Sequence, residues 1–168
     1  GDPKNGMPVS DETAFNIGSV TKQFTGYVIL ELKRENKLSL SDPISKYIPE
    51  IGQKPMGQIT VSQLANMTSG IPYVLPTKDF IKVQFSDRIR SPDEMISEIA
   101  LLDLESQPGQ RFNYSNLGYS LLGVIISRIE KVSWAESLRK RIFDPFKMVN
   151  TTTEGDSPER PENLATGL

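Results

Sequence analysis

The sequence predicts a mainly α-helical domain, and three observations support this prediction. Apolar residues recur at helical spacing in most of the periodic segments, several segments open with helix-capping residues, and five or six alternating strands cannot be found. The chain has 168 residues, which is the size of one ordinary domain and is enough to bury a hydrophobic core without disulfides or metals.

The first part of the chain is predicted to be a loop that leads into a long helix. Residues 1–18 form an approach loop in this prediction, because three turn-forming or helix-breaking residues, Pro3, Gly6 and Pro8, interrupt it. From Ser19 to about Asn36 the pattern is helical, because apolar side chains recur every fourth residue along one face: Val20, Phe24, Val28 and Leu32.

Two shorter helical segments are predicted next. Residues 38–49 suggest a loop with one helical turn that begins at Pro43, since proline is favoured in the first turn of a helix. Residues 60–67 suggest a short helix capped by Thr60, and Gly70 is a suitable residue to terminate it. Residues 72–90 mix proline, aspartate and aromatic residues, which is typical of a loop.

The second half predicts three more helices, each with a recognisable start. Ser91 is followed by a proline and then by a glutamate three residues on, which together predict a helix to about Leu102. A long apolar helix is predicted over residues 115–131. Ser133 and the glutamate three residues after it predict a last helix to about Phe143.

These elements predict one helical domain over residues 1–168 that ends in a polar, irregular segment, residues 145–168. The longest apolar run, Leu121–Ile126, is far shorter than the roughly 20 residues that a membrane-spanning helix needs. The net charge of -2 gives no electrostatic reason to expect binding to nucleic acid or to an anionic membrane.

The composition also excludes several kinds of catalytic site. The chain contains no histidine and no cysteine, which excludes a Ser-His-Asp triad, a cysteine nucleophile and zinc sites of the Cys/His type. Acidic residues are spread along the chain, so no metal site is predicted and no cofactor is expected. A catalytic base in this chain would have to be a lysine, a tyrosine or a carboxylate.

Without histidine, a serine nucleophile can be activated by a lysine three residues later, because these two positions lie on one face of a helix. The chain has this spacing twice, at Ser19 and Lys22 and again at Ser137 and Lys140. About one such match is expected by chance in a chain of this size. Ser137 follows a cap and lies among basic residues, which suggests a solvated helix face, whereas Ser19 precedes an apolar helix.

A second candidate is the stretch Tyr114-Ser115-Asn116, the one Tyr-x-Asn in the chain, at a predicted junction between a loop and a helix. Side chains at such a junction can project into a cleft. The alternative is an ordinary helix cap, in which Ser115 or Asn116 satisfies free backbone N–H groups and Tyr114 packs on the core.

Four stretches of the chain carry a further signal: Phe15–Thr25, Lys37–Pro43, Ile59–Ile71 and Pro108–Tyr119. In this order they resemble four segments of the serine β-lactamase and penicillin-binding-protein family, and most of all of its class C β-lactamase, DD-peptidase and esterase branch. The family segments are the one that carries the nucleophile, the loop after it, the "TxxxLLTHTSGI" segment and the "PGxxxxYSNxGY" segment.

The resemblance implies a role for four residues. Ser19 would be the acylated nucleophile, and Lys22 would accept its proton or polarise it. Tyr114 would assist proton transfer to the leaving group, and Asn116 would hydrogen-bond Lys22 or the amide of the substrate. The implied fold is the helical domain of the β-lactamase/transpeptidase-like α+β fold, with most of its antiparallel sheet missing from this chain.

The chain departs from the family pattern at two places. Asn66 stands where the family often has histidine. The third family motif, Lys-Thr-Gly or His-x-Gly, is absent, since Ala165-Thr166-Gly167 has no cation and comes too early in the family order. By resemblance, the backbone N–H of Ser19 would be one donor of an oxyanion hole and the family sheet would carry the second. That sheet would come from strands before residue 1 and after residue 168, so this chain alone is expected to be impaired as a catalyst.

The expected function is therefore that of a serine hydrolase acting through an acyl-serine intermediate. Its substrate would be a small molecule or peptide, namely a β-lactam, a D-amino-acid peptide or a small ester, and the missing sheet of the same protein would pack on this chain. The resemblance favours a periplasmic or extracellular location. The alternatives are a non-catalytic helical binding module and an inactive fragment of such an enzyme.

Overall fold

The computed structural model describes residues 6, 8–52, 55–73, 91–153 and 163–165. Within these ranges the chain is helical and has no strand, only two isolated β-bridges, which confirms the mainly α prediction. The α-helices are α1 (Thr21–Arg34), α2 (Val61–Ala65), α4 (Pro92–Ala100), α5 (Asn116–Glu130) and α6 (Trp134–Leu138). The short turns are η2 (Gly18–Val20), η3 (Ile44–Lys46), η4 (Pro49–Ile51), η5 (Pro55–Gln58) and the π-helical η6 (Arg139–Phe143).

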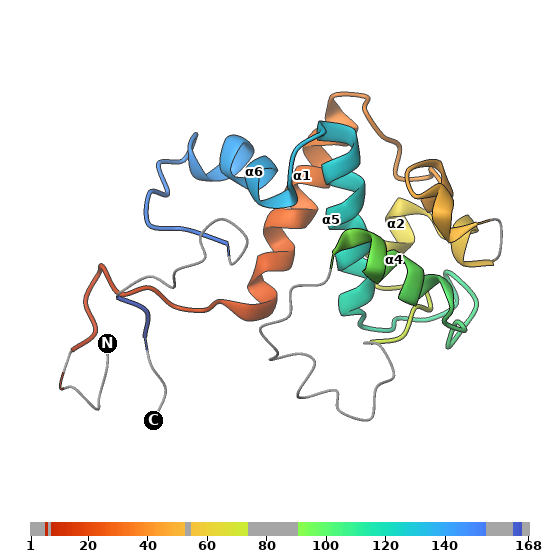
Figure 1. The fold of residues 1–168 in the computed structure, drawn as a ribbon, viewed down its shortest axis with the longest axis horizontal. Coiled ribbons are helices and arrows are strands. Elements are labelled where there is room, and N and C mark those ends of the chain that lie inside the picture. Colours follow the sequence, from red (N-terminus) through yellow and green to blue (C-terminus); the bar gives the residue numbers. More distant parts are fainter. Residues whose placement is uncertain (1–5, 7, 53–54, 74–90, 154–162, 166–168) are drawn as a thin grey trace.

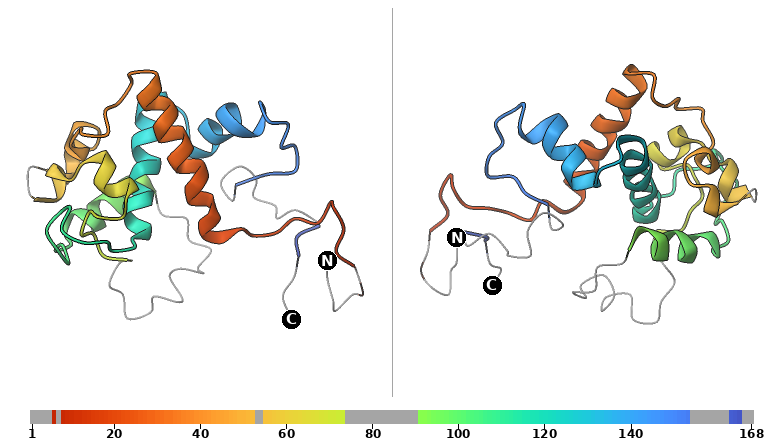
Figure 2. Two further views of the ribbon diagram at one scale, coloured as in Figure 1. Left: turned by 180° about the vertical axis from the view of Figure 1, so that it is seen from behind. Right: turned by 45° about the horizontal axis from the view of Figure 1, so that its top comes forward.

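Helix α5 is the central element, because it contacts α1, α2, α4 and α6. Figures 1 and 2 show α1 and α5 beside each other, with α2 and α4 on one side of the pair and α6 on the other. Its sequence explains this position, since apolar residues occupy most of its surface rather than one narrow stripe.

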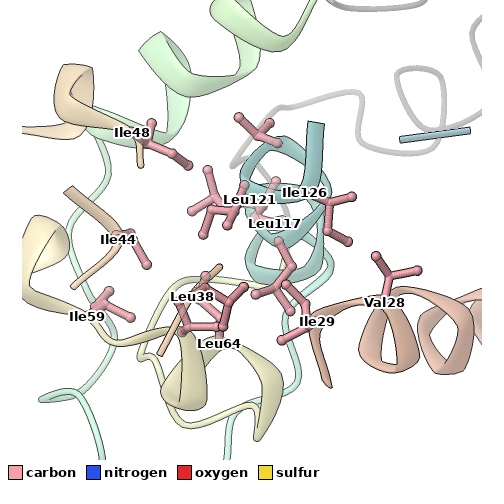
Figure 3. Close-up of a cluster of buried hydrophobic side chains, with 14 of the residues drawn as sticks. Val28, Ile29, Leu38, Ile44, Ile48, Ile59, Leu64, Leu117, Leu121 and Ile126 are labelled. Atoms are coloured by element: carbon pink, nitrogen blue, oxygen red, sulfur yellow. The ribbon is translucent and has the colours of Figure 1, made fainter. Parts of the chain in front are cut away.

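The core lies where α1, α2 and α5 meet the loop that carries η3 and η4 (Figure 3). Its members are fully or almost fully buried aliphatic side chains, and burying each of them stabilises the fold by about 1.5–3 kcal/mol. The side chains labelled in Figure 3 are Val28, Ile29, Leu38, Ile44, Ile48, Ile59, Leu64, Leu117, Leu121 and Ile126.

Four predicted helix starts are confirmed by the hydrogen bonds of their caps. Thr60 and Ser91 form complete capping boxes at α2 and α4, with distances of 3.2 Å from each cap oxygen to the backbone nitrogen it accepts from. Ser115 and Ser133 accept from backbone N–H groups at the starts of α5 and α6, each at 3.0 Å. Gly70 was expected to terminate the helix predicted over residues 60–67, but α2 ends at Ala65, and the left-handed residue next to its end is Met67, with a φ of 58°. Gly70 also has a left-handed φ, of 77°, in the loop farther on.

Two expectations about exposure are wrong. Val20 was expected to belong to the apolar face of the first helix, but it is 50% exposed because it lies in the 3-10 turn η2, where the register of α1 does not hold. Ser137 was expected on a solvated helix face, but it is 0% exposed and its hydroxyl donates to a carboxylate oxygen of Glu130 at 3.2 Å.

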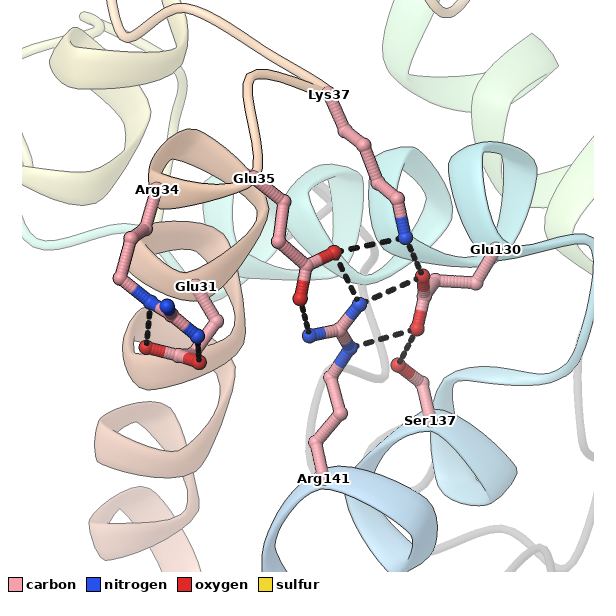
Figure 4. Close-up of polar contacts among 7 residues, drawn as sticks. All are labelled: Glu31, Arg34, Glu35, Lys37, Glu130, Ser137 and Arg141. Atoms are coloured by element: carbon pink, nitrogen blue, oxygen red, sulfur yellow. Dashed lines mark hydrogen bonds and ion pairs between the residues drawn. The ribbon is translucent and has the colours of Figure 1, made fainter.

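A cluster of charged residues joins the ends of three elements. Figure 4 shows the guanidinium of Arg141, on η6, between the carboxylates of Glu35 and Glu130, which lie just after α1 and at the end of α5. Arg141 donates to both oxygens of each carboxylate at 2.7–2.9 Å. The Lys37 ammonium contacts the same two carboxylates at 2.8 and 3.3 Å. These ion pairs hold the last helical segment against α1 and α5.

The two ends of the described chain meet at a parallel bridge between Ala14 and Leu164. Residues 8–17 and 145–153 contain no helix, while residues 74–90, 154–162 and 166–168 lie outside the described part. None of the described helices is long and apolar enough to cross a membrane.

Candidate active site

Ser19 lies in the turn that leads into α1. Gly18 before it adopts a left-handed φ of 50°, a conformation that glycine adopts readily, and its N–H donates to the side-chain oxygen of Asn16 at 2.9 Å. This turn leaves the Ser19 side chain exposed at the start of the helix. Lys22 follows in the first turn of α1, and its ammonium donates to Ser19 Oγ at 3.1 Å. The three-residue spacing thus produces the contact that the sequence suggested.

The third group comes from a distant part of the chain. The phenol of Tyr114 donates to Ser19 Oγ at 2.7 Å, although the two residues are 95 positions apart. Tyr114 is placed by its buried neighbour Ser115, whose hydroxyl caps α5 and also donates to the Pro72 carbonyl oxygen at 2.8 Å. The backbone nitrogen of Asn113 donates to the Met67 carbonyl at 2.7 Å, so both sides of Tyr114 are attached to the segment after α2.

Electrostatics favour ionisation of Tyr114. The largest cause of a lowered pKa for this phenol is a side-chain hydrogen bond with Lys22, whose ammonium nitrogen lies 5.0 Å from the centre of the Tyr114 ring. The hydrogen bond with Ser19 lowers the pKa further, and partial burial opposes both effects. In this arrangement Ser19 Oγ accepts from two donors, one of them positively charged, and such a pair stabilises negative charge developing on that oxygen.

Asn116, the remaining predicted site residue, occupies the first position of α5. Its backbone N–H donates to the Tyr73 carbonyl at 3.0 Å. Among the described residues its side chain makes no hydrogen bond to Lys22. The structure therefore brings Ser19, Lys22 and Tyr114 together, while the role of Asn116 toward a substrate stays a prediction.

The second Ser-x-x-Lys spacing does not produce a serine–lysine contact. Ser137 is buried against Glu130, and the Lys140 ammonium pairs with Glu136 at 2.6 Å. The same spacing therefore brings serine and lysine into contact at Ser19, whereas Ser137 is a buried serine within α6. No group of three metal-ligating side chains gathers anywhere in the described ranges.

The sequence profile of the family described as Beta-lactamase matches residues 1–167. The chain belongs to the beta-lactamase family. It is similar to Protein flp of Staphylococcus aureus (strain MW2), with 34% identity over 149 residues, or 87% of this chain. It spans only 29% of the length of that relative, and 40% of the Escherichia coli (strain K12) relative described as a beta-lactamase.

Solved structures of this family share the fold. The octameric penicillin-binding protein homologue from Pyrococcus abyssi superposes with a TM-score of 0.80 at 34% identity, over 99% of this chain and 39% of that one. A D-stereospecific amidohydrolase from Streptomyces sp. gives 0.77 at 30% identity, over 87% and 46%. A class C beta-lactamase gives 0.74 at 24% identity, over 88% and 38%, a likeness of fold alone. The chain thus corresponds to the helical part of a β-lactamase/transpeptidase-like fold.

Tyr119 lies beside the site, although the sequence assigned it no role. It lies one turn into α5, its ring centre is 5.8 Å from the Lys22 ammonium, and its hydroxyl donates to the Ala65 carbonyl at 3.1 Å. It belongs to the family-like stretch Pro108–Tyr119, but its position near Lys22 depends on how α5 packs against α1, which sequence spacing does not reveal.

Proposed function

We propose that this protein is a serine hydrolase of the beta-lactamase family that acts through an acyl-Ser19 intermediate on an amide or an ester. The observation that supports the proposal best is the convergence of Lys22 Nζ and the Tyr114 hydroxyl on Ser19 Oγ, at 3.1 and 2.7 Å. A nucleophile within hydrogen-bond reach of its candidate bases is the arrangement that covalent catalysis by a hydroxyl requires.

The proposed reaction has two halves. In the first, Ser19 Oγ bonds to the carbonyl carbon of the substrate while its proton passes to Lys22 or to Tyr114, whichever is deprotonated. The carbon–nitrogen or carbon–oxygen bond then breaks, and the leaving group takes a proton from Tyr114. In the second half, water bonds to the acyl carbon while one of its protons passes to Tyr114, which has given its own proton to the leaving group. The bond between the acyl carbon and Ser19 Oγ then breaks, Oγ takes the proton from Tyr114, and the carboxylic acid leaves. Asn116 is assigned to substrate binding by resemblance.

The substrate class is proposed as a β-lactam, a D-amino-acid peptide or a small ester. The similar Streptomyces protein is described as a D-stereospecific amidohydrolase, which supports amide substrates for a fold of this kind. Family resemblance does not select among the three, because a single fold hosts related chemistries on different substrates.

The remainder of the family fold is proposed to pack on α1, in line with the greater length of the relatives. Three large apolar side chains at the start and along α1 are between 41% and 55% exposed: Val20, Tyr27 and Leu30. Exposed apolar side chains gathered on one helix are typical of a surface that another element covers.

The intact mass of the protein after incubation with a β-lactam or a fluorophosphonate tests this proposal. We expect one covalent adduct on the product of the complete gene and none on a Ser19→Ala variant. Ser137→Ala is the matched control, because it removes the other serine with the same spacing to a lysine, and it should still be labelled. An adduct that survives Ser19→Ala would contradict the proposal.

The alternative is a helical module that retains the scaffold for binding without catalysis. The absence of the third family motif from these 168 residues favours it. Turnover of an ester or β-lactam by these residues alone, abolished by Lys22→Ala, would exclude the alternative.

A further inference from the structure

The ammonium of Lys22 lies near two aromatic rings, and within the described part of the chain it pairs with no carboxylate. Its nitrogen is 5.0 Å from the centre of the Tyr114 ring and 5.8 Å from that of Tyr119, both within the range of a cation–π contact. Among the described residues Lys22 forms no ion pair, and its hydrogen-bond acceptor is Ser19 Oγ. Besides the hydrogen bond to Ser19 Oγ, the two rings are thus the groups beside the cation that can keep it next to the serine.

Tyr119 is itself held rigidly. It lies in the second turn of α5, packs against the hydrophobic core and donates its hydroxyl proton to the Ala65 carbonyl at the end of α2. Burial raises the pKa of this phenol, so Tyr119 stays neutral over the pH range in which Tyr114 ionises. A neutral ring fixed at both ends is suited to orienting a mobile side chain.

Lys22 has an alternative direction available to it. A groove of about 480 Å³ runs along α1 away from Ser19, and its lining includes Lys22, Gly26, Leu30, Ser62 and Tyr119. A Cβ atom added at Gly26 would meet nothing within 4 Å, so the helix leaves this space open. A lysine has a flexible four-carbon stem, and without a ring at its side the ammonium could turn into the open groove instead of toward Ser19.

We propose that Tyr119 is a positioning residue, whose ring holds the Lys22 ammonium against Tyr114 and Ser19. This inference rests on the proposed function, because it concerns the same lysine, but it predicts a property that can be measured without any turnover. The ring is the part that acts, and the hydroxyl serves to anchor it to Ala65.

The titration of Tyr114 provides the test, because the nearby ammonium lowers the pKa of that phenol. Tyrosines labelled with ¹³C at the ζ carbon are titrated by NMR, and the Tyr114 signal is assigned as the one that Tyr114→Phe removes. Lys22→Met should raise the midpoint of Tyr114 toward its ordinary value of about 10. Tyr119→Leu should move the midpoint in the same direction by a smaller amount.

Two control variants separate the ring from its surroundings. Tyr119→Phe keeps the ring and loses the bond to Ala65, so the midpoint should stay near that of the wild-type protein. Tyr27→Leu removes another tyrosine that lines the same groove. It should leave the Tyr114 midpoint unchanged. An unchanged midpoint in a folded Tyr119→Leu variant would overturn the proposal.

If Tyr119→Leu does not fold, a second measurement tests the contact between the Tyr119 ring and Lys22. In a Tyr114→Leu variant the Lys22 ε-methylene protons should keep an upfield shift caused by the Tyr119 ring, and protons at their random-coil position would refute the contact.

A kinetic experiment links the position of Lys22 to the chemistry. The rate of acylation by the fluorophosphonate should fall roughly two- to fivefold in Tyr119→Leu, the effect of losing one such contact. If the product of the complete gene is not acylated, the proposed function fails, whereas the titration still reports on Tyr119. If acylation occurs and neither the rate nor the midpoint changes, only the role of Tyr119 is refuted.

Discussion

The three groups at Ser19 illustrate what one residue spacing can and cannot establish. Ser19 and Lys22 share a helix start, so their contact follows from helical geometry alone. Ser137 and Lys140 have the same spacing, yet Ser137 is buried against Glu130. What separates the two pairs is the tertiary surroundings. The sequence could suggest both, and only the arrangement of α5 and the loop before it brings Tyr114 to one of them.

The contacts of Tyr114 and Tyr119 with the start of α1 could not be predicted from residue spacing. Tyr114 was identified through family resemblance, because no spacing rule relates two residues 95 positions apart. Tyr119 was part of the same stretch but received no role, because its contact with Lys22 depends on the packing of α5 against α1.

The lowered pKa of Tyr114 leads to a prediction about pH. If the phenolate takes the proton of Ser19, acylation should become faster as the pH rises through the Tyr114 pKa, which lies below the ordinary value of about 10. Tyr114→Phe should lower the rate about 100-fold or more and abolish this rise. Lys22→Met should move the midpoint upward, because it removes the main cause of the lowered pKa.

Stopped-flow acylation between pH 6 and pH 10.5 measures these effects, within the range where a tyrosine of this kind titrates. Tyr27→Phe is a suitable control, since it makes the same chemical change on an exposed part of α1. A pH rise that persists unchanged in Tyr114→Phe would assign the base to Lys22 instead.

At the scale of the elements, the positions of helix starts were predicted well because their chemistry is local. A serine or threonine accepts a hydrogen bond from a backbone N–H two or three residues on, whatever surrounds it, and Thr60, Ser91, Ser115 and Ser133 all do so. The start of α1 has no side-chain cap, and the helix begins at Thr21, two residues after the predicted start. There the serine hydroxyl contacts Lys22 and Tyr114 and does not cap the helix.

The π-helical turn η6 could not be predicted from pattern, because apolar spacing does not distinguish it from a continued α-helix. Its Arg141 lies between Glu35 and Glu130, and these partners come from the ends of α1 and α5. The pKa of each carboxyl is lowered from 4.5 to about 2, with Arg141 as the largest cause in both cases and Lys37 as a further one.

The charged cluster predicts how stability depends on pH. Both carboxyl pKa values are lower in the folded protein, so their contribution is complete above the unfolded value of about 4.5. It is lost as the pH falls from about 5 toward 2. Arg141→Met leaves Glu130 only 13% exposed without its main partner. We expect a loss of about 2–3 kcal/mol in the free energy of unfolding at pH 7, and a smaller slope below pH 5.

Urea unfolding of the two proteins at a series of pH values gives both quantities. Arg34→Met is the matched control, since it removes an arginine whose partner Glu31 lies one turn away on α1 and whose side chain is 71% exposed. Surface pairs of this kind contribute little. Equal losses in the two variants would show that the Arg141 cluster does not hold η6 in place.

At the scale of the whole molecule, the candidate site lies on the exposed side of α1. Ser19 and the Val20, Tyr27 and Leu30 side chains are open to solvent, while the buried core is on the other side of α1. The relatives are two to three times longer, as the covered shares of 29–46% indicate. The position of Ser19 at a free edge of the helical part is thus in keeping with a site completed by further elements of the fold.

The proposed dependence of Ser19 acylation on the further elements of the fold can be measured. Acylation of Ser19 by the fluorophosphonate should be roughly 100- to 1,000-fold slower in the 168-residue chain than in the product of the complete gene, because the proposed sheet carries the second oxyanion donor. Circular dichroism must show that both proteins are helical, and Ser19→Ala must abolish labelling in both. Equal acylation rates would mean that Lys22 and Tyr114 suffice, and that the elements proposed to pack on α1 contribute nothing to acylation.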